Sequence, residues 1–466
     1  MDFFDDIDVY GDLTAVITED SEHISYKALL LAADALKKQL EGRCLVFSVC
    51  ENSLESVIGY IGFLRAKAVP VLISDNTNLE LFNGLLETYR PKYIWLPQYK
   101  AEMMENCSLV YRHGNYVLLK TSYDIDYLLH DDLALLLTTS GSTGSPKLVR
   151  LSYKNITSNA DSIAEYLGIT QADRPITTLP MSYTYGLSMI NSHFLRGCPI
   201  ILTNKTLMSK VFWELLKANN ATTFGGVPYT YEMLKKLRFF RMELPSLKVL
   251  TQAGGKLSRT LSEEFAIFCQ QKGIRFFVMY GQAEASPRMS YLPCEYAIEK
   301  AGSIGIAIPG GTFWLEDDIG HVIKNNDTVG ELVYKGENVC MGYALNYADL
   351  CKGDENEGIL KTGDMAKRDD DGFYYIVGRK KRFLKLFGNR VNLDEVEQLL
   401  KYAGYDCACA GEDDNLKIFV TSKENHEKIK CYISEQISIN HAGFTIRYIE
   451  TIPRSESGKA LYYALK

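Results

Sequence analysis

The chain has 466 residues, enough for two or three domains of typical size. Its composition, 46% hydrophobic and 23% charged, is that of an ordinary globular protein, and its net charge of −7 argues against a nucleic-acid-binding surface. No apolar run approaches the roughly 20 residues that a membrane-spanning helix needs. The acidic start Met1–Asp6 differs from the basic start of a secretory signal, so we expect a cytoplasmic protein.

The eleven cysteines are odd in number, and none has C-x-x-C spacing. We therefore expect reduced thiols rather than a disulfide framework or a zinc knuckle. The seven histidines form no His-Glu-x-x-His motif, which argues against a metal-dependent hydrolase.

Through about residue 285, short apolar runs alternate with amphipathic stretches. Helices are predicted at residues 26–40 and 54–66, and strands at residues 44–49 and 69–73. The same alternation returns at residues 249–279. Near-continuous apolar strands separated by helices indicate mainly parallel sheets that are covered by helices on both faces.

Functional loops in such sheets are expected at the carboxyl ends of strands. Two candidates follow the apolar runs 133–137 and 276–279. From about Gly302 the sequence changes to glycine-punctuated β-type segments such as 330–334. A basic stretch, residues 379–382, then precedes a small mixed segment, so we predict the main domain boundary near 378–382.

Within that last segment, Asn392 and Glu395 have the spacing of a capping box. Val396, Leu399 and Leu400 share one face of the helix predicted to follow them.

The sharpest local motif reads Thr-Thr-Ser-Gly-Ser-Thr-Gly-Ser-Pro-Lys from Thr138 to Lys147. Its glycines allow close backbone approach to an anion, its hydroxyls can donate to phosphate oxygens, and Lys147 adds a positive charge. It is not a Walker loop, because Pro146-Lys147-Leu148 stands where Gly-Lys-Ser/Thr is required. A polar turn without a ligand is the alternative. The position directly after an apolar strand favours a phosphate-binding loop.

This loop resembles the phosphate-binding loop of the AMP-forming superfamily, which contains acyl-CoA synthetases, peptide-synthetase adenylation domains and luciferases. Further segments resemble that family, in the same order, over nearly the whole chain. They are Tyr280-Gly281-Gln282-Ala283-Glu284, Gly302-Ser303-Ile304-Gly305, Thr362-Gly363-Asp364, Gly378-Arg379, Gly388-Asn389-Arg390-Val391 with Glu395-Val396-Glu397, and Pro453-Arg454 with Gly458-Lys459. Each motif is weak alone, and the ordered set is specific.

The resemblance implies an α/β fold. A large N-terminal domain, residues 1–378, would hold mainly parallel sheets covered by helices and a β-rich subdomain. A small mobile α+β domain, residues 379–466, would follow the hinge. The implied reaction is ATP-dependent activation of a carboxylic acid to an acyl-adenylate with release of pyrophosphate. The acyl group then passes to a thiol, coenzyme A being the leading candidate, and Mg²⁺ accompanies ATP.

The resemblance also assigns residues to the nucleotide. The loop 139–147 would bind the β- and γ-phosphates, and Gly254, Gly255 and Tyr280 would line the adenine. Asp364 would accept both ribose hydroxyls, with Arg379 nearby. The full nucleotide-binding set is Thr139, Ser140, Gly141, Ser142, Thr143, Gly144, Lys147, Gly254, Gly255, Tyr280, Gly281, Asp364 and Arg379.

Structural alternatives stand beside these roles. A packed core tyrosine is the alternative for Tyr280, and an ion pair between domains is the alternative for Asp364 and Arg379. Glu284, which the resemblance makes the Mg²⁺ ligand, could instead be a surface carboxylate.

The resemblance makes Lys459, Glu284 and Tyr183 the catalytic residues. Lys459 would bridge the carboxylate and the α-phosphate and stabilise charge that develops in the transition state. Tyr183 would guard the carboxylate. In this family the small domain rotates after adenylation, which removes the lysine and opens the approach of the thiol.

One residue departs from the family pattern. Ala283 stands where a threonine normally contacts the α-phosphate. The loss of one hydrogen bond to a charged group costs roughly 1.5–3 kcal/mol. Since Glu284 and Lys459 are both present, an active enzyme is favoured.

The acid and its acceptor stay open. Residues 179–186 contain no aspartate for a substrate ammonium, so an uncharged acyl or aryl acid is favoured over an amino acid. The sequence ends just past the Lys459 motif, so the thiol is expected on coenzyme A or on the phosphopantetheine of a separate carrier protein. The alternatives are a stand-alone enzyme that loads such a carrier, or a catalytically weak nucleotide-binding relative, with Ala283 as the hint. Oxidative light emission as in luciferases would need a specialised substrate.

Overall fold

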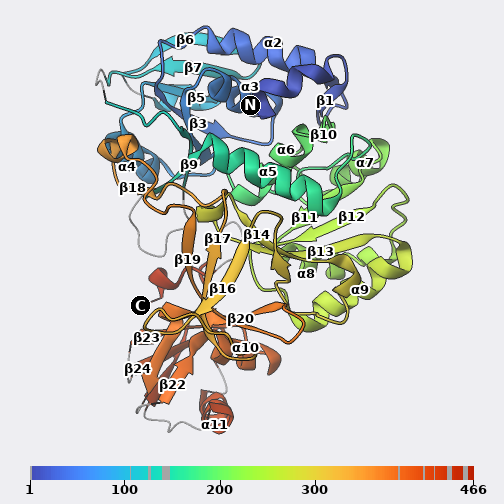
Figure 1. Cartoon of the computed structure of the whole chain (residues 1–466), viewed down its shortest axis with the longest axis vertical. Coiled ribbons are helices and arrows are strands. Elements are labelled where there is room, and N and C mark those ends of the chain that lie inside the picture. Colours follow the sequence, from blue (N-terminus) through green and yellow to red (C-terminus); the bar gives the residue numbers. More distant parts are fainter. Residues whose placement is uncertain are drawn as a thin grey trace. The chain divides into compact units, whose positions relative to one another are not determined.

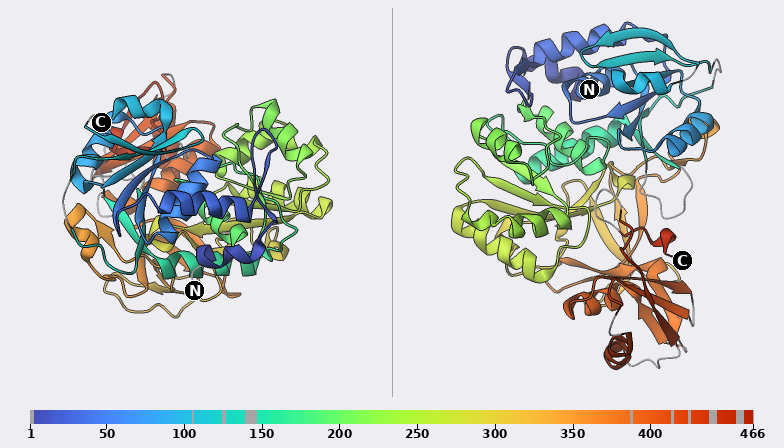
Figure 2. Two further views of the ribbon diagram at one scale, coloured as in Figure 1. Left: turned by 90° about the horizontal axis from the view of Figure 1, so that it is seen from above. Right: turned by 180° about the vertical axis from the view of Figure 1, so that it is seen from behind.

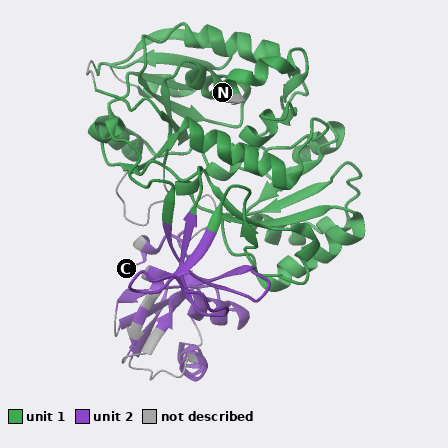
Figure 3. Ribbon diagram, in the orientation of Figure 1, with its two compact units in different colours: residues 1–141, 145–312, 335–360 green, residues 142–144, 313–334, 361–466 purple. Residues whose placement is uncertain are grey.

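The computed structural model describes residues 3–104, 106–123, 127–138, 147–386, 389–412, 415–423, 426–437, 443–454 and 460–465. The chain divides into two compact units (Figure 3). Among the described residues, unit 1 holds those up to 312 and those from 335 to 360, and unit 2 holds 313–334 and those from 361 onward. The boundary predicted at residues 378–382 falls inside unit 2 and stays a prediction.

As far as the structure describes the chain, the largest sheet of unit 1 has eight strands. In spatial order they are β18 (Tyr343–Ala344), β9 (Leu148–Ser152), β8 (Leu133–Thr138), β4 (Val69–Ser74), β3 (Leu45–Cys50), β5 (Tyr93–Pro97), β7 (Tyr116–Lys120) and β6 (Ser108–His113). The four central strands β8, β4, β3 and β5 run parallel, and the strands outside them pair antiparallel. The predicted parallel sheet is thus the centre of a mixed one.

Both faces of this sheet are buried, as the near-continuous apolar strands predicted. Because alternate residues of a strand point to opposite faces, β3 contributes to two separate cores. Leu45, Phe47 and Val49 pack in one cluster with residues of α4 (Leu79–Tyr89). Val46 and Cys50 pack in the other, with residues of α2 (Tyr26–Lys37) and α3 (Leu54–Arg65). Figures 1 and 2 show α2 and α3 side by side against these strands.

Both helices begin where a serine caps the amino end. The amide of Ala28 donates to Ser25 Oγ at 3.1 Å, and the amide of Ser56 donates to Ser53 Oγ at 3.3 Å. Such side chains satisfy amides that lack a partner within the first turn. The first helix ends at Lys37, three residues before its predicted end, and the second agrees with its prediction to one residue.

The second sheet of unit 1 has five strands. They are β11 (Thr223–Gly226), β12 (Val249–Gln252), β13 (Arg275–Gly281), β14 (Arg288–Leu292) and β15 (Ile306–Ala307). The first three run parallel and the last two antiparallel. A third sheet is formed by β10 (Ile200–Ile201), β1 (Thr14–Ile17) and β2 (His23–Ser25).

Unit 1 also contains α1 (Phe3–Asp6), α5 (Tyr153–Leu167), α6 (Thr184–Phe194), α7 (Lys210–Ala218), α8 (Pro228–Lys236) and α9 (Arg259–Lys272). A core cluster joins α5 and α6 to the five-stranded sheet through residues such as Ile163, Tyr185, Val249 and Met279.

Cysteines are free thiols at all eleven positions, which agrees with the expectation. Within the described residues, no helix has the length and apolarity needed to cross a membrane.

Among the described residues, unit 2 contains three sheets, the first of which extends by one or two residues into unit 1 at Thr312, Lys335 and Ile359. One is formed by β16 (Thr312–Glu316), β17 (Gly330–Lys335), β19 (Ile359–Arg368) and β20 (Tyr374–Arg379), another by β21 (Phe383–Leu386) and β22 (Asn389–Asn392), and the third by β23 (Cys407–Glu412), β24 (Asn415–Val420) and β25 (Phe444–Tyr448). Its helices are α10 (Leu393–Tyr402) and α11 (His426–Ile437). Val396 and Leu400 of α10 lie in its core, as their helical spacing predicted. Asn392 caps α10, but it accepts from the amide of Asp394, not from that of Glu395.

Candidate active site

Nine of the predicted site residues belong to the described part of the chain. Lys147, Tyr183, Gly254, Gly255, Tyr280, Gly281 and Glu284 lie in unit 1, and Asp364 and Arg379 lie in unit 2. The loop residues Thr139, Ser140, Gly141, Ser142, Thr143 and Gly144, and the predicted catalytic Lys459, lie outside the described residues.

Two of the predicted segments leave neighbouring strands at the same edge of the five-stranded sheet. Gly254 and Gly255 follow β12, and Tyr280 and Gly281 end β13. The two strands are parallel neighbours, so their carboxyl ends meet (Figure 1). Ligands of open α/β sheets bind at this edge.

Tyr183 lies against this edge as well. A Cβ atom added at Gly254 would lie 2.7 Å from Tyr183 Oη, and Gly254 has a φ of +82°. A side chain at this position would therefore be strained and would collide with the tyrosine. The structure brings together two residues that the sequence assigned separately, one to the carboxylate and one to the adenine.

Gly281 serves a close approach of two backbone segments. A Cβ atom there would lie 1.7 Å from the carbonyl oxygen of Pro287, which also accepts from the amide of Gln282 at 2.9 Å. Only glycine fits at this position. The tight turn sends the chain from β13 into the short 3-10 helix η4 (Ala283–Ala285), which carries Glu284.

Tyr280 is half-buried, and its hydroxyl accepts from Gln282 Nε2 at 3.4 Å. This partial exposure differs from that of the core tyrosines Tyr60 and Tyr231, which are fully buried. It favours a ring with one accessible face over the packed core tyrosine that was the alternative.

The central feature of the site is Tyr343, which contacts two of the predicted site residues, Glu284 and Lys147. The hydroxyl of Tyr343 donates to Glu284 Oε1 at 2.5 Å. The ammonium of Lys147 lies 3.7 Å from the centre of the same tyrosine ring. The side chains assigned to Mg²⁺ and to the phosphates therefore converge on Tyr343.

The strand register explains this convergence. Tyr343 of β18 pairs with Val149 of β9, and Lys147 stands two residues before Val149. Residues two apart in extended chain point to the same side, so the lysine lies over the ring. The backbone ties Glu284 to the same place, because the amide of Cys340 donates to its carbonyl oxygen at 2.8 Å.

The electrostatics of this contact follow from burial and from one charge. Burial raises the pKa of Tyr343 well above its usual range, and the negative charge of Glu284 raises it further. Burial also raises the pKa of the neighbouring Cys340 thiol to about 12. Both groups therefore stay protonated near neutral pH, and Tyr343 remains a hydrogen-bond donor to the carboxylate.

In unit 2, Asp364 and Arg379 face each other across β19 and β20. Arg379 Nε lies 2.8 Å from Asp364 Oδ1, and the carboxylate is 4% exposed while the arginine side chain is 57% exposed. The sequence left open an ion pair between domains as the alternative role of these residues. The structure shows an ion pair between them, but it joins two neighbouring strands of one sheet. The pair places a buried carboxylate beside an exposed cation.

A Mg²⁺ ion would find few protein ligands here. Among the described residues, no group of three or more His, Cys, Asp or Glu side chains is arranged to hold a metal. Mg²⁺ in nucleotide enzymes is typically held by one or two carboxylates together with phosphate oxygens and water. The single carboxylate Glu284 fits that ligand set.

Sequence reasoning did not single out Tyr343 or Arg288. Tyr343 follows Gly342 in a glycine-punctuated segment, and only its register beside β9 places it at the site. Arg288 pairs with Gly281 across β13 and β14, and it is 3% exposed. Its position four residues after Glu284 was the one signal in the sequence that could have placed Arg288 near the site.

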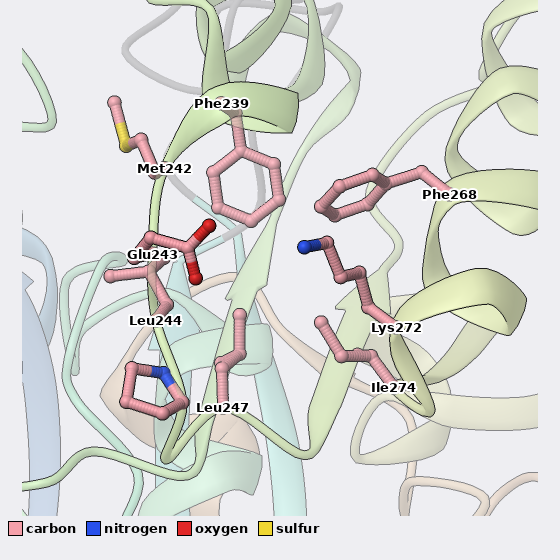
Figure 4. Close-up of a pocket in the computed structure, with 9 residues that line it drawn as sticks. Phe239, Met242, Glu243, Leu244, Leu247, Phe268, Lys272 and Ile274 are labelled. Atoms are coloured by element: carbon pink, nitrogen blue, oxygen red, sulfur yellow. The ribbon is translucent and has the colours of Figure 1, made fainter.

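A small pocket of about 110 Å³ lies elsewhere in unit 1 (Figure 4). Leu247 in its wall lies two residues before β12, and Ile274 directly precedes β13, so the pocket belongs to the amino ends of these strands. Glu243 and Lys272 point into it from opposite walls. The pocket contains none of the predicted site residues.

Comparison with known proteins agrees with this geometry. The AMP-binding enzyme family matches residues 3–344. The chain is 28% identical to a 2-succinylbenzoate–CoA ligase of Bacillus velezensis over 73% of this chain and 69% of the relative. It is 26% identical to the ligase of that name from Oceanobacillus iheyensis over 84% and 82%.

Solved structures share the fold. O-succinylbenzoate coenzyme A synthetase (MenE) from Bacillus subtilis in complex with AMP superposes with a TM-score of 0.80 at 23% identity, over 100% of this chain and 98% of that one. ATP-bound MatB from Rhodopseudomonas palustris gives 0.79 at 21%, over 99% and 97%. These likenesses confirm the predicted α/β fold class. Because the family match spans most of the sequence, the chain belongs to the AMP-binding enzyme family.

Proposed function

We propose that the protein is an AMP-forming acid–thiol ligase that activates a carboxylic acid with ATP and transfers the acyl group to coenzyme A. The observation that carries the proposal is the convergence of Lys147 and Glu284 on Tyr343 in a chain of the AMP-binding enzyme family. An ammonium and a carboxylate beside one ring suit a nucleoside triphosphate accompanied by Mg²⁺.

In the first half-reaction, a carboxylate oxygen of the acid bonds to the α-phosphorus of ATP, and the bond from that phosphorus to pyrophosphate breaks. No bond to the enzyme forms, so the protein positions the reactants and offsets charge. Lys147 would offset charge on the phosphates, and Glu284 would hold Mg²⁺. When bound, that ion withdraws charge from the leaving pyrophosphate.

Three further residues receive roles from the resemblance. Asp364 would accept the ribose hydroxyls, since a carboxylate offers two acceptor oxygens, with Arg379 holding it in place. Lys459 would bridge the acid and the α-phosphate. We also retain a rotation about residues 378–382 between the two half-reactions.

In the second half-reaction, the sulfur of a thiol bonds to the acyl carbon, AMP leaves with the bonding electrons, and the thiol proton passes to solvent. The relatives are named as CoA ligases, which supports coenzyme A as the acceptor over a carrier protein. We place the reaction in the cytoplasm, where ATP and coenzyme A are available.

The test measures pyrophosphate release from ATP and Mg²⁺ with a panel of carboxylic acids. We expect acid-dependent release in the wild type and its collapse in Lys459→Ala. Lys430→Ala is the matched control, because Lys430 pairs with Glu427 on the same helix, α11, and should keep full activity. Formation of acyl-CoA when coenzyme A is added, detected by mass, distinguishes it from a carrier protein as acceptor.

Two outcomes would contradict the proposal. ATP binding without acid-dependent pyrophosphate release would identify a catalytically weak relative, the alternative that Ala283 suggested. Release that persists in Lys459→Ala would remove the assigned role of that lysine.

A further inference from the structure

Two arginine side chains are buried in the described part of the chain, and their surroundings differ. Arg150 is fully buried and fully paired. Its guanidinium donates to the carbonyl oxygens of Tyr343 at 3.1 Å and Met341 at 2.8 Å, and it forms an ion pair with Glu355 at 2.5 Å. This arginine ties β9 to the segment that carries Tyr343.

Arg288 has no such set of acceptors. Its Nη2 donates to Ser188 Oγ at 3.2 Å, and its Nη1 lies 3.0 Å from the sulfur of Met279. Its Nε has no hydrogen-bond partner, and no acidic side chain among the described residues forms an ion pair with it. The guanidinium carbon lies 3.9 Å from the centre of the Tyr185 ring.

The sulfur of Met279 is a weak acceptor that faces two strong donors, the first of which is Arg288. The hydroxyl of Tyr166 also points at the sulfur of Met279, at 3.0 Å. A thioether is a poor acceptor, whereas a guanidinium and a phenol are strong donors. Natural proteins rarely bury a charge without a partner, because desolvation then goes uncompensated. Within the part of the chain that the structure describes, this arrangement lacks an anionic acceptor.

The position of Arg288 points to where that acceptor comes from. Arg288 opens β14 directly opposite Gly281, at the carboxyl end of β13. It is therefore at the edge where Gly254, Gly255 and Glu284 lie. Its positive charge also acts on Tyr183, where it lowers a pKa that burial raises more strongly. Tyr183 is the residue that the sequence assigned to the substrate carboxylate.

We propose that Arg288 binds a second anionic group of the acid substrate, so that the substrate is an acid with two negative charges, such as a dicarboxylate. This inference rests on the proposed function, because it concerns the acid that is activated there. It revises the expectation of an uncharged acyl group, which rested on residues 179–186 alone. The absence of an aspartate in that stretch still argues against an amino acid.

The test compares each diacid with a matched acid that has the same skeleton and one negative charge fewer. Aliphatic and aromatic dicarboxylic acids are assayed for pyrophosphate release beside their monomethyl esters, which keep one carboxylate and the same skeleton. We expect the wild type to favour the diacid over the ester. In Arg288→Met, kcat/KM for the diacid should fall by about 100-fold, which is the size of effect that loss of a buried charge partner produces. The ester should be little affected.

Two further variants separate recognition from folding. Arg288→Lys keeps the charge without the two-pronged geometry, so the KM for the diacid should rise while the diacid stays preferred. Arg275→Met is the matched control at the opposite end of β13, where Arg275 donates to the carbonyl oxygen of Leu167 at 2.7 Å. It should leave the ratio of diacid to ester unchanged. If Arg288→Met does not fold, the KM of Arg288→Lys for the diacid decides whether Arg288 binds the second anionic group.

The outcomes that overturn the inference are distinct from failure of the proposed function. An ester as good as the diacid in the wild type, or an equal loss of both in Arg288→Met, would overturn it and leave Arg288 with a role in the reacting carboxylate or in packing. If no acid is activated, the proposed function fails. The melting temperature then decides on Arg288, since a diacid should raise it in the wild type and not in Arg288→Met, and no rise in either would refute the site.

Discussion

Tyr343 donates a hydrogen bond of 2.5 Å to the carboxylate of Glu284 while its ring supports the ammonium of Lys147 at 3.7 Å. Tyr343 and Glu284 are 59 residues apart along the chain. One aromatic side chain therefore orients a carboxylate and a cation that the sequence had assigned separately to one nucleotide.

Replacement of Tyr343 by phenylalanine tests this orientation. The ring stays under Lys147, but Glu284 loses a hydrogen bond to a charged group, which is typically worth about 1.5–3 kcal/mol. We expect the Mg²⁺ concentration for half-maximal pyrophosphate release to rise at least tenfold. Tyr347→Phe is the control, because Tyr347 lies in the next turn and contacts Arg90 and Tyr127. An unchanged Mg²⁺ requirement in Tyr343→Phe would contradict the positioning role.

Asp364 offers a test of the ribose assignment in unit 2. Asp364→Asn keeps the shape and removes the charge that faces Arg379. The KM for ATP should rise about tenfold or more, the effect of losing about 1.4 kcal/mol of binding free energy, with little change in melting temperature because Arg379 is largely exposed. Asp327→Asn is a matched control, since Asp327 pairs with Lys367 at 2.8 Å in the same unit. Equal effects of both variants on the KM would argue for a purely structural ion pair.

Ala283 is half-buried against the core of unit 1, in the position where the family has a threonine. If a hydroxyl there assists the reaction, Ala283→Thr should raise the rate of pyrophosphate release about tenfold, the gain expected from about 1.4 kcal/mol. Ala283→Val has the same shape without the hydroxyl and should not gain. A slower Ala283→Thr enzyme would mean that this site is built around alanine.

His193 predicts how stability depends on pH. The side chain is 1% exposed, and burial lowers its pKa from 6.5 to about 4. Above pH 6.5 the histidine is neutral in both the folded and the unfolded state. Between pH 6.5 and 4 only the unfolded state gains the proton, so the free energy of unfolding should fall by about 3 kcal/mol as the pH drops through this range.

Denaturant unfolding measured from pH 7 to pH 4 checks this expectation. His193→Gln should flatten the pH dependence over that range, whatever its effect on stability at pH 7. His23→Gln, at an exposed histidine of β2, should leave the slope as in the wild type. A wild-type slope in His193→Gln would mean that other groups cause the acid sensitivity.

Much of the fold was predictable because its signals are local. The spacing of apolar residues marked α2 and α3, and near-continuous apolar runs marked β3, β4 and β13. The antiparallel strands at the edges of the large sheet were not predicted, because pairing direction depends on where the chain returns and not on the pattern within one strand.

The sequence by itself determined the family, the ordered motifs and the carboxyl-end position of Gly281 and Glu284. Those signals lie within short stretches whose chemistry needs particular residues in a row. Only the tertiary structure decided that Tyr343 joins Lys147 to Glu284. It alone also decided that Arg288 is buried without an acidic partner among the described residues, while Arg150 is paired. Such contacts depend on the register between distant strands and on which side chains the packing removes from water. The sequence around a single residue carries no record of either.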